Sequence, residues 1–384
     1  MNKKIALIVG GSNGIGLSIA QQLLQKEYEK IYILDRVEPD VNLGEQIIYV
    51  IFNLLNDDYS ILEQFKDIDT LIITAGFGRI AEFDEITDIE IINSYKVNAM
   101  AVIRIIKYFY PRIIQQEDFY CAVMGSIAGL ISSPMFAVYG STKAAICKFI
   151  ESINIEIEKK GSSNKILNIS PGQIKGTKFN NDGINNLEQT RHLANDIIDN
   201  MLQKNTLFIP QYEEVFKGVL YNYHSDPHEF GMKSFEYKKN SGRTISKPQI
   251  KIGYLSGTFD LFHIGHLNLF RRAKEYCDYL VVGVHKDALH KGKQTFISFE
   301  ERLEIVQNIK YVDKVIPSYQ EDMDAYPEVQ YDFLFVGSDY EGSERFQRYE
   351  KYFEDKDVKI IYFPYTKGTS SSQLRAVIEK SSKD

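Results

Sequence analysis

Tyr139 and Lys143 are a pair of side chains whose types and spacing suit acid–base chemistry. Residues four positions apart share one face of a helix, so the phenol and the ammonium would be neighbours there. A tyrosine with its ordinary pKa of about 10 exchanges protons poorly at neutral pH. A nearby ammonium favours the phenolate, so we interpret Tyr139 as an acid–base group that Lys143 activates. The alternative is a chance Tyr–Lys pair on an amphipathic helix, in a chain with 25 tyrosines.

His263 and His266 form a second pair, which suits chemistry on a phosphate. Histidines three positions apart at a helix start face the same way, and the positive end of the helix favours bound phosphate. Two imidazoles and backbone N–H groups can stabilise the charge that grows on a triphosphate during displacement at its α-phosphorus. Two alternatives stay open: structural histidines with satisfied hydrogen bonds, and a zinc site with two His ligands. We predict no metal ion held by the protein itself, because no third ligand such as that of an HExxH motif lies nearby.

Two loops could hold the phosphates, since each follows an apolar run and precedes a helical pattern. The first loop contains Gly10, Gly14 and Gly16, which permit a tight turn, close approach of the backbone to a pyrophosphate, and close helix–strand packing. The second is Gly257-Thr258-Phe259-Asp260, directly before the two histidines. The first loop therefore predicts a dinucleotide site and the second a nucleoside triphosphate site.

Asp35 ends the second predicted strand and bears on the choice of dinucleotide. Its carboxylate can accept hydrogen bonds from both ribose hydroxyls and would repel a 2′-phosphate. This favours NAD(H) over NADP(H), although Arg36 beside it could soften the preference. The alternative is an aspartate at a strand end that only meets solvent.

The elements that must position these residues follow an alternating pattern in both halves of the chain. In the first half, apolar runs separated by helix-length segments predict a doubly wound parallel sheet. Its predicted strands are 5–9, 31–34, 47–52, 70–73, 122–124 and 166–169, and a further helix over 190–203 with the segment 207–210 closes the unit. The first predicted domain is 1–222, and it ends where the composition of the chain changes.

A polar segment rich in helix breakers, 223–249, follows the first domain, and we interpret it as a linker. The second domain, 250–384, has a similar strand–loop–helix opening but different motifs. Its predicted strands are 251–255, 279–284, 333–336 and 359–363, and its predicted helices are 265–276, 299–309 and 372–380. The fold class is therefore α/β, with two Rossmann-like doubly wound parallel-sheet domains joined by a linker.

The composition argues against several classes of protein. A chain of 384 residues is long enough for two domains with separate cores. Its net charge of −7 argues against a nucleic-acid partner. Three scattered cysteines fit a reducing compartment, and no stretch approaches the roughly 20 apolar residues of a membrane span. We expect a cytoplasmic protein with no membrane partner.

Residues 4–180 resemble the short-chain dehydrogenase/reductase family. Ser126 matches the family serine that hydrogen-bonds the substrate carbonyl, and Asn98 matches the asparagine that supports a proton-relay water. With Tyr139 and Lys143 they make a four-residue catalytic set, and the resemblance implies reversible interconversion of a ketone and an alcohol with NAD(H). The residues that it places around the cofactor are Gly10, Ser12, Asn13, Gly14, Ile15, Gly16, Asp35, Asn53, Ala75, Gly76, Tyr139, Lys143, Pro171, Gly172 and Thr177.

Three positions depart from the pattern of that family. Thr74 replaces the first asparagine of its Asn-Ala-Gly strand end, and Asn53 stands where an aspartate commonly meets the adenine. Thr177 falls one place later than the usual threonine after the Pro-Gly pair, so contacts to the nicotinamide differ there.

Residues 251–380 resemble the cytidylyltransferase superfamily, and within it the bacterial glycerol-3-phosphate cytidylyltransferases. Lys291 and Lys293 fall where that family has phosphate-binding lysines, and we count them with His263 and His266 as catalytic. The resemblance implies CTP with Mg²⁺, although Tyr365 and Lys310 replace family arginines. The residues that it places around CTP are Gly257, Thr258, Phe259, His263, His266, Lys293, Asp339, Thr369, Ser370 and Ser371.

Together the two halves predict a bifunctional enzyme that makes a CDP-polyol. A ketose phosphate or another small phosphorylated ketone is reduced, and the polyol phosphate is then joined to CMP with release of pyrophosphate. Such products resemble donors for teichoic-acid-like or capsular polymers, and both resemblances imply a homodimer or homotetramer. Three alternatives stay open: a reductase that acts on a CDP-linked carbonyl, an N-terminal half that only senses the dinucleotide or dimerises, and another acceptor such as phosphocholine or a heptose phosphate, with ATP in place of CTP.

Overall fold

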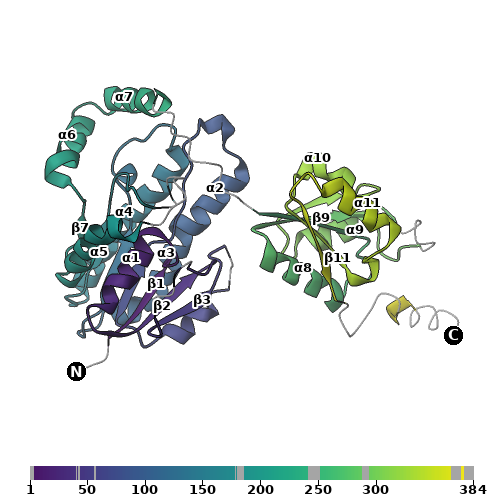
Figure 1. Cartoon of the computed structure of the whole chain (residues 1–384), viewed down its shortest axis with the longest axis horizontal. Coiled ribbons are helices and arrows are strands. Elements are labelled where there is room, and N and C mark those ends of the chain that lie inside the picture. Colours follow the sequence, from purple (N-terminus) through teal and green to yellow (C-terminus); the bar gives the residue numbers. More distant parts are fainter. Residues whose placement is uncertain are drawn as a thin grey trace. The chain divides into compact units, whose positions relative to one another are not determined.

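The chain divides into two units, Met1–Pro248 and Gln249–Asp384, and each is built on its own sheet (Figure 1). The computed structural model describes residues 4–39, 41, 44–55, 58–177, 179, 186–240, 251–287, 294–364 and 373–375. Within this described part of the chain, no helix is both long enough and apolar enough to span a bilayer.

The first unit has a seven-stranded sheet in the order β3-β2-β1-β4-β5-β6-β7. Every neighbouring pair of its strands is parallel. The strands are β1 (Lys4–Val9), β2 (Tyr28–Asp35), β3 (Ile47–Ile51), β4 (Thr70–Ile73), β5 (Tyr120–Met124), β6 (Ile166–Ile169) and β7 (Leu207–Phe208). The strand order reverses between β1 and β4, and the carboxyl edge at such a reversal is where open α/β sheets bind ligands.

Helices cover both faces of this sheet and bury a separate apolar core on each. Alternate residues of β1 enter opposite cores, with Leu7 and Val9 in one and Ala6 and Ile8 in the other. The helices are α1 (Gly14–Leu24), α2 (Asp88–Tyr95), α3 (Val102–Ile113), α4 (Ala137–Lys159), α5 (Leu187–Leu202), α6 (Lys217–Ser225) and α7 (Pro227–Asn240), with short helical segments at η1 (Ser60–Phe65), η2 (Phe83–Glu85), η3 (Lys96–Ala101), η4 (Ile127–Gly129) and η6 (Tyr212–Phe216). The predicted doubly wound parallel sheet is confirmed.

The structure differs from the predicted linker, because residues 223–240 are largely helical. Helix α6 runs to Ser225, and α7 begins at Pro227. The residues that we interpreted as breakers start a helix here: Asp226 Oδ1 accepts a hydrogen bond from Glu229 N at 2.9 Å. Proline suits the first helical position, where its missing N–H removes no intrahelical hydrogen bond.

The second unit has a five-stranded sheet in the order β10-β9-β8-β11-β12, again with parallel neighbours. Its strands are β8 (Ile252–Gly257), β9 (Tyr279–Val284), β10 (Lys314–Pro317), β11 (Phe333–Gly337) and β12 (Lys359–Phe363). Its helical elements are α8 (Ile264–Tyr276), α9 (Phe299–Gln307), η8 (Asp322–Ala325), α10 (Tyr326–Val329), η9 (Ser338–Tyr340) and α11 (Glu344–Phe353). The strand order reverses between β8 and β11. Of the predicted last helix, 372–380, the structure describes only 373–375, which are helical.

Candidate active sites

The predicted catalytic tyrosine and lysine lie on α4, which follows the carboxyl end of β5. Lys143 Nζ is 5.6 Å from the centroid of the Tyr139 ring, so the two side chains are neighbours on one helix face. Lys143 is 2% exposed and Tyr139 is 8% exposed. Lys143 Nζ also donates to Met124 O at 2.7 Å, which ties α4 to the end of β5.

Burial shifts the pKa of both groups toward their neutral forms. It raises the pKa of Tyr139 to about 12, against the effect of a hydrogen bond to Ser126. It lowers the pKa of Lys143 to about 8. Desolvation therefore favours the neutral phenol of Tyr139 in the protein alone. A neutral phenol can donate a hydrogen bond or a proton.

Asn98 and Ser126 lie on neighbouring segments and hold the surroundings of Tyr139 in place. Asn98 is fully buried in η3, a π-helical turn of the kind that recurs at functional positions. Its Oδ1 accepts from Phe77 N at 3.0 Å, and its Nδ2 donates to Phe77 O at 2.8 Å and to Thr142 Oγ1 at 3.2 Å. Ser126 accepts from Ala128 N at 3.2 Å. Asn98 thus joins the loop after β4 to α4.

The glycine loop after β1 has the geometry that a pyrophosphate requires. Gly10 and Gly14 have φ values of 87° and 53°, and a Cβ on Gly10 would lie 2.4 Å from Ala75 N. A Cβ on Gly16 would lie 2.3 Å from Gly10 O, so α1 begins directly against the loop. The Ser12 hydroxyl is buried in this loop, near the Tyr49 phenol. These residues fit a bound dinucleotide.

The other predicted cofactor residues lie along the same edge of the first sheet. Asp35 ends β2, and its Oδ2 accepts from Ser12 N at 3.0 Å. Thr177 packs against the loop, since its Cβ would be 3.3 Å from a Cβ on Gly14. Thr74, which departs from the family pattern, donates its hydroxyl to Gly10 O at 2.9 Å. The remaining predicted residues flank the start of α1 or follow β3, β4 and β6: Asn13, Ile15, Asn53, Ala75, Gly76, Pro171 and Gly172.

The two predicted histidines lie together at the N-terminus of α8. His263 Nδ1 accepts from Gly265 N at 3.0 Å, and His266 Nδ1 accepts from His263 N at 3.4 Å. The imidazole rings stack with their centroids 3.9 Å apart, and partial burial lowers the pKa of His263. Because each Nδ1 accepts a hydrogen bond, each neutral ring carries its proton on Nε2. The pair thus offers two N–H donors beside a helix N-terminus.

The loop between β8 and α8 has a strained backbone. Phe259 and Leu261 have φ values of 53° and 50°, a conformation that costs free energy in residues with a Cβ. The ring of Phe259 is 4% exposed and packs at 5.1 Å from the ring of Phe270, so this predicted CTP residue anchors the loop in the core. The buried Thr258 Oγ1 has no partner within the described ranges. Backbone strain and an unsatisfied hydroxyl are features that recur in ligand-binding loops.

Arg302 is a positioning residue that sequence reasoning missed. It is fully buried, and its guanidinium donates to four backbone carbonyls: Thr258 O at 2.6 Å, His285 O and Lys286 O at 2.7 Å, and Ile297 O at 3.0 Å. One side chain therefore joins the loops after β8 and β9 to the segment before α9. A fork of five N–H donors suits this task.

Five of the predicted residues lie outside the described residues: Lys291, Lys293, Thr369, Ser370 and Ser371. The segment that follows the two lysines is held by Asp260, which accepts from Phe296 N at 3.1 Å and from Ile297 N at 3.0 Å. Asp260 also pairs with Arg375. Asp339 is exposed in η9, directly after β11, on the same edge of the sheet.

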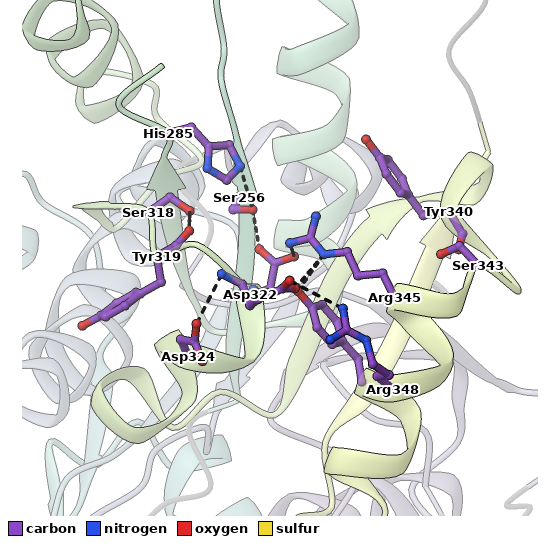
Figure 2. A network of polar contacts seen from close by, with 12 residues as sticks. Ser256, His285, Ser318, Tyr319, Asp322, Asp324, Tyr340, Ser343, Arg345 and Arg348 are labelled. Atoms are coloured by element: carbon purple, nitrogen blue, oxygen red, sulfur yellow. Dashed lines mark hydrogen bonds and ion pairs between the residues drawn. The ribbon is translucent and has the colours of Figure 1, made fainter. Parts of the chain in front are cut away.

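A polar network lines this edge of the second sheet (Figure 2). Ser256, near the end of β8, donates to Asp322 Oδ1 and lies 3.4 Å from Nε2 of His285. Asp322 is 7% exposed and also accepts from Arg345 Nη2 at 3.3 Å, while Arg345 Nε donates to Glu321 at 2.9 Å. A buried carboxylate with these partners fixes the end of β8, beside the loop that leads to α8.

Comparison with known proteins gives each unit a family. The model of short chain dehydrogenases matches residues 4–188, and the cytidylyltransferase-like model matches residues 254–377. Glycerol-3-phosphate cytidylyltransferase of Bacillus subtilis (strain 168) is 35% identical over 126 residues, which are 32% of this chain and 92% of that protein. The chain belongs to the cytidylyltransferase-like family.

The first unit of this cytidylyltransferase-like protein matches the short chain dehydrogenase model over residues 4–188. An uncharacterized oxidoreductase of Staphylococcus epidermidis (strain ATCC 12228 / FDA PCI 1200) is 24% identical over 194 residues, which are 47% of this chain and 84% of that protein. A crystal structure of a short chain dehydrogenase/reductase from Burkholderia phymatum in complex with NAD shares the fold, with a TM-score of 0.50, 17% identity, and coverage of 64% of this chain and 97% of that chain. Both families consist of enzymes, so the chain is an enzyme with an oxidoreductase domain and a nucleotidyltransferase domain.

Proposed function

We propose that this chain makes a CDP-polyol in two consecutive reactions. The first unit reduces a ketose phosphate or a small phosphorylated ketone, and the second couples the resulting polyol phosphate to CMP. The proposal rests on two pairs of side chains in one chain. A buried Tyr139–Lys143 pair lies at the edge of the first unit's sheet, and a stacked His263–His266 pair lies at the edge of the second unit's sheet. The first reaction converts the ketone into a hydroxyl group and so makes a polyol phosphate. The phosphate group of that polyol is the nucleophile of the second reaction.

In the reductase, this chain's residues orient the carbonyl and supply its proton. Bound NADH supplies the hydride that the carbonyl carbon receives. Tyr139 donates its phenolic proton to the carbonyl oxygen, because burial keeps that proton in place, and a proton from solvent restores the phenol. Ser126 hydrogen-bonds the same oxygen, and the Lys143 ammonium stabilises the phenolate left behind. Asn98 keeps the loop after β4 and helix α4 in register.

In the transferase, a phosphate oxygen of the polyol phosphate attacks the α-phosphorus of CTP. The bond from that phosphorus to the pyrophosphate breaks and pyrophosphate leaves, and Mg²⁺ bound with CTP would offset its charge. The Nε2–H groups of His263 and His266 and the N-terminus of α8 stabilise the charge that develops. We assign phosphate contacts also to Lys291, Lys293 and the 369–371 segment, and a nucleotide contact to Asp339. The product is a donor for a teichoic-acid-like or capsular polymer, formed in the cytoplasm.

The reductase is proposed to prefer NADH because of Asp35. Asp35→Asn keeps an acceptor for Ser12 N but removes the charge that repels a 2′-phosphate. We expect the ratio of kcat/KM for NADH over that for NADPH to fall about tenfold, which corresponds to roughly 1.4 kcal/mol. Steady-state kinetics with both cofactors measure this ratio, and an unchanged ratio contradicts the assignment.

The proposed function is tested by incubating the purified protein with NADH, CTP, Mg²⁺ and pooled ketose phosphates, followed by mass spectrometry. A new cytidine diphosphate species that carries the two hydrogen atoms of the reduction supports it. Leaving out CTP fixes the order of the reactions. NADH oxidation without CTP supports reduction first, and oxidation only after CTP is added supports reduction of a CDP-linked carbonyl.

A further inference from the structure

A helical arm after β7, residues 212–240, connects loops at the carboxyl edge of the first sheet. The arm consists of η6, α6 and α7, which run outside the packed layers of the unit (Figure 1). At its start, Phe216 Cζ would lie 2.2 Å from a Cβ on Gly172, in the loop after β6. At its end, Lys238 Nζ donates to Ser133 Oγ and to Pro134 O, both at 2.9 Å, in the loop after β5. The arm therefore reaches from one active-site loop to the next.

The loop that Lys238 contacts leads directly to the catalytic tyrosine. Ser133 and Pro134 lie between Ser126 and Tyr139 in the sequence. Phe136 stacks on the ring of Tyr139, with the ring centroids 4.3 Å apart. Ser133 also lies near the residue that follows Tyr139, since its Cβ would be 3.7 Å from a Cβ on Gly140, so the Lys238 ammonium is close to the reductase site.

The inner face of the arm is only half buried. None of the residues of η6, α6 and α7 is buried completely. Half-buried side chains recur at helical spacing: Phe216, Leu220 and Tyr223 before the bend, then Phe230, Ser234 and Lys238 after it. A helix that packs on a core buries a continuous apolar stripe of side chains. This face therefore lies over the loops but is not buried tightly against them.

The groups around Lys238 Nζ form a donor set for an anion. The ammonium also donates to Ser234 Oγ at 3.1 Å. A hydroxyl that accepts from an ammonium keeps its own proton, so Ser133 and Ser234 can each donate to a third group. The three N–H groups of the ammonium are taken by Ser133, Pro134 and Ser234, so a phosphate would accept from the two hydroxyls while the ammonium acts through its charge. Burial lowers the pKa of Lys238 to about 8, and a bound anion would offset this lost hydration.

We propose that Lys238, together with Ser133 and Ser234, binds the phosphate of the molecule that the reductase domain reduces. The arm 212–240 covers that molecule and makes the reductase selective for phosphorylated substrates. This inference rests on the proposed function and identifies the residues that recognise its substrate. The phosphate belongs either to a phosphorylated ketone or to a CDP-linked carbonyl, and the two sources share the same chemistry.

The test compares Lys238→Gln with Lys239→Gln, its neighbour on α7. Lys239 is an exposed lysine that pairs with Glu82 at 3.4 Å, so this control removes the same charge from the same helix. Each variant is assayed with NADH and three pairs of ketoses with and without phosphate: dihydroxyacetone, ribulose and fructose. We expect KM for the phosphorylated member to rise about 10- to 100-fold in Lys238→Gln, with no change for its unphosphorylated partner or in the control. Lys238→Arg, which keeps the charge, should restore most of the loss.

A second readout separates this inference from the proposed function. The fluorescence of bound NADH is titrated with the same ketose phosphates, with a CDP-linked ketose, and with inorganic phosphate at constant ionic strength. If wild-type protein reduces none of the compounds but binds phosphate in a way that only Lys238→Gln abolishes, the inference stands and the proposed reduction fails. If ketose phosphates are reduced and Lys238→Gln behaves like Lys239→Gln in both assays, the inference fails and the proposed function stands. Binding of the CDP-linked ketose alone assigns the phosphate to that source.

Discussion

Tyr139→Phe is expected to lower kcat for reduction of a ketose phosphate by a factor of about 10² to 10⁴, the usual contribution of a positioned proton donor. The change removes one hydroxyl and keeps the ring, which stacks on Phe136 and contacts Phe179, so the packing should survive. The carbonyl oxygen then has no proton donor in the place where charge develops. NADH oxidation with the best ketose phosphate measures the loss.

The same variant contains its own control in the second unit. Formation of CDP-polyol from CTP and an added polyol phosphate should remain at the wild-type rate, because the residues around His263 belong to a separate unit. Titration of NADH fluorescence should show unchanged cofactor binding. If Tyr139→Phe left all measurable product formation intact, the alternative in which the first unit only senses the dinucleotide would be favoured.

The pH dependence of reduction should follow Lys143. Burial lowers the pKa of this lysine to about 8, so its ammonium is present below that pH and is lost above it. The neutral amine cannot stabilise the phenolate that proton donation leaves on Tyr139, so kcat at saturating substrate should fall as the pH rises through about 8. The pKa of Tyr139 itself, raised to about 12, is too high to cause a fall in this range. A flat profile between pH 7 and roughly 9.5 contradicts this role of Lys143.

Much of the fold and of both sites could be predicted because the relevant signals are local in sequence. The buried strands of parallel sheets are continuous apolar runs, so β4 and β6 were predicted at the residues that the structure gives. The spacing of Tyr139 and Lys143 fixes their proximity through helix geometry alone. The histidine pair at the start of α8 follows the same rule.

Contacts between distant segments could not be predicted in this way. In the sequence Arg302 is one of several charged residues in a predicted helix. Only the folded chain shows that its guanidinium is buried among four backbone carbonyls. Asp322 and Ser256 meet across the sheet edge, and no spacing rule relates them. The raised pKa of Tyr139 has the same origin, because desolvation depends on everything packed around the ring.

The arm 212–240 shows a different limit of sequence reasoning. Its Ser-Asp-Pro sequence is typical of a turn, and it is also the sequence of a helix N-terminus. In the structure Glu229 N donates a hydrogen bond to Asp226, and the segment starts a helix. The role of Lys238 then depends on where the helix lies relative to Ser133, more than a hundred positions away in numbering, which is a tertiary contact.

Removing the histidine pair is expected to have the largest effect on the second reaction. His266→Ala should lower kcat for CDP-polyol formation from CTP and glycerol 3-phosphate or ribitol 5-phosphate by a factor of about 10² to 10³, the usual effect of one lost donor to developing charge. His263→Ala should have a similar effect, and also disturbs the start of α8, where His263 Nδ1 accepts from Gly265 N. Release of pyrophosphate measures both rates.

Three comparisons distinguish a direct role of the pair from a structural one. His266→Gln retains an N–H donor and should recover part of the loss, whereas a residue needed only for packing against Phe259 would gain nothing from a polar replacement. The double variant should be little worse than either single one, because stacked rings that act on one group are not additive. With Mg²⁺ in excess, a zinc-selective chelator should leave the wild-type rate unchanged. Loss of activity with that chelator would instead support the zinc alternative, in which the two imidazoles bind a metal ion.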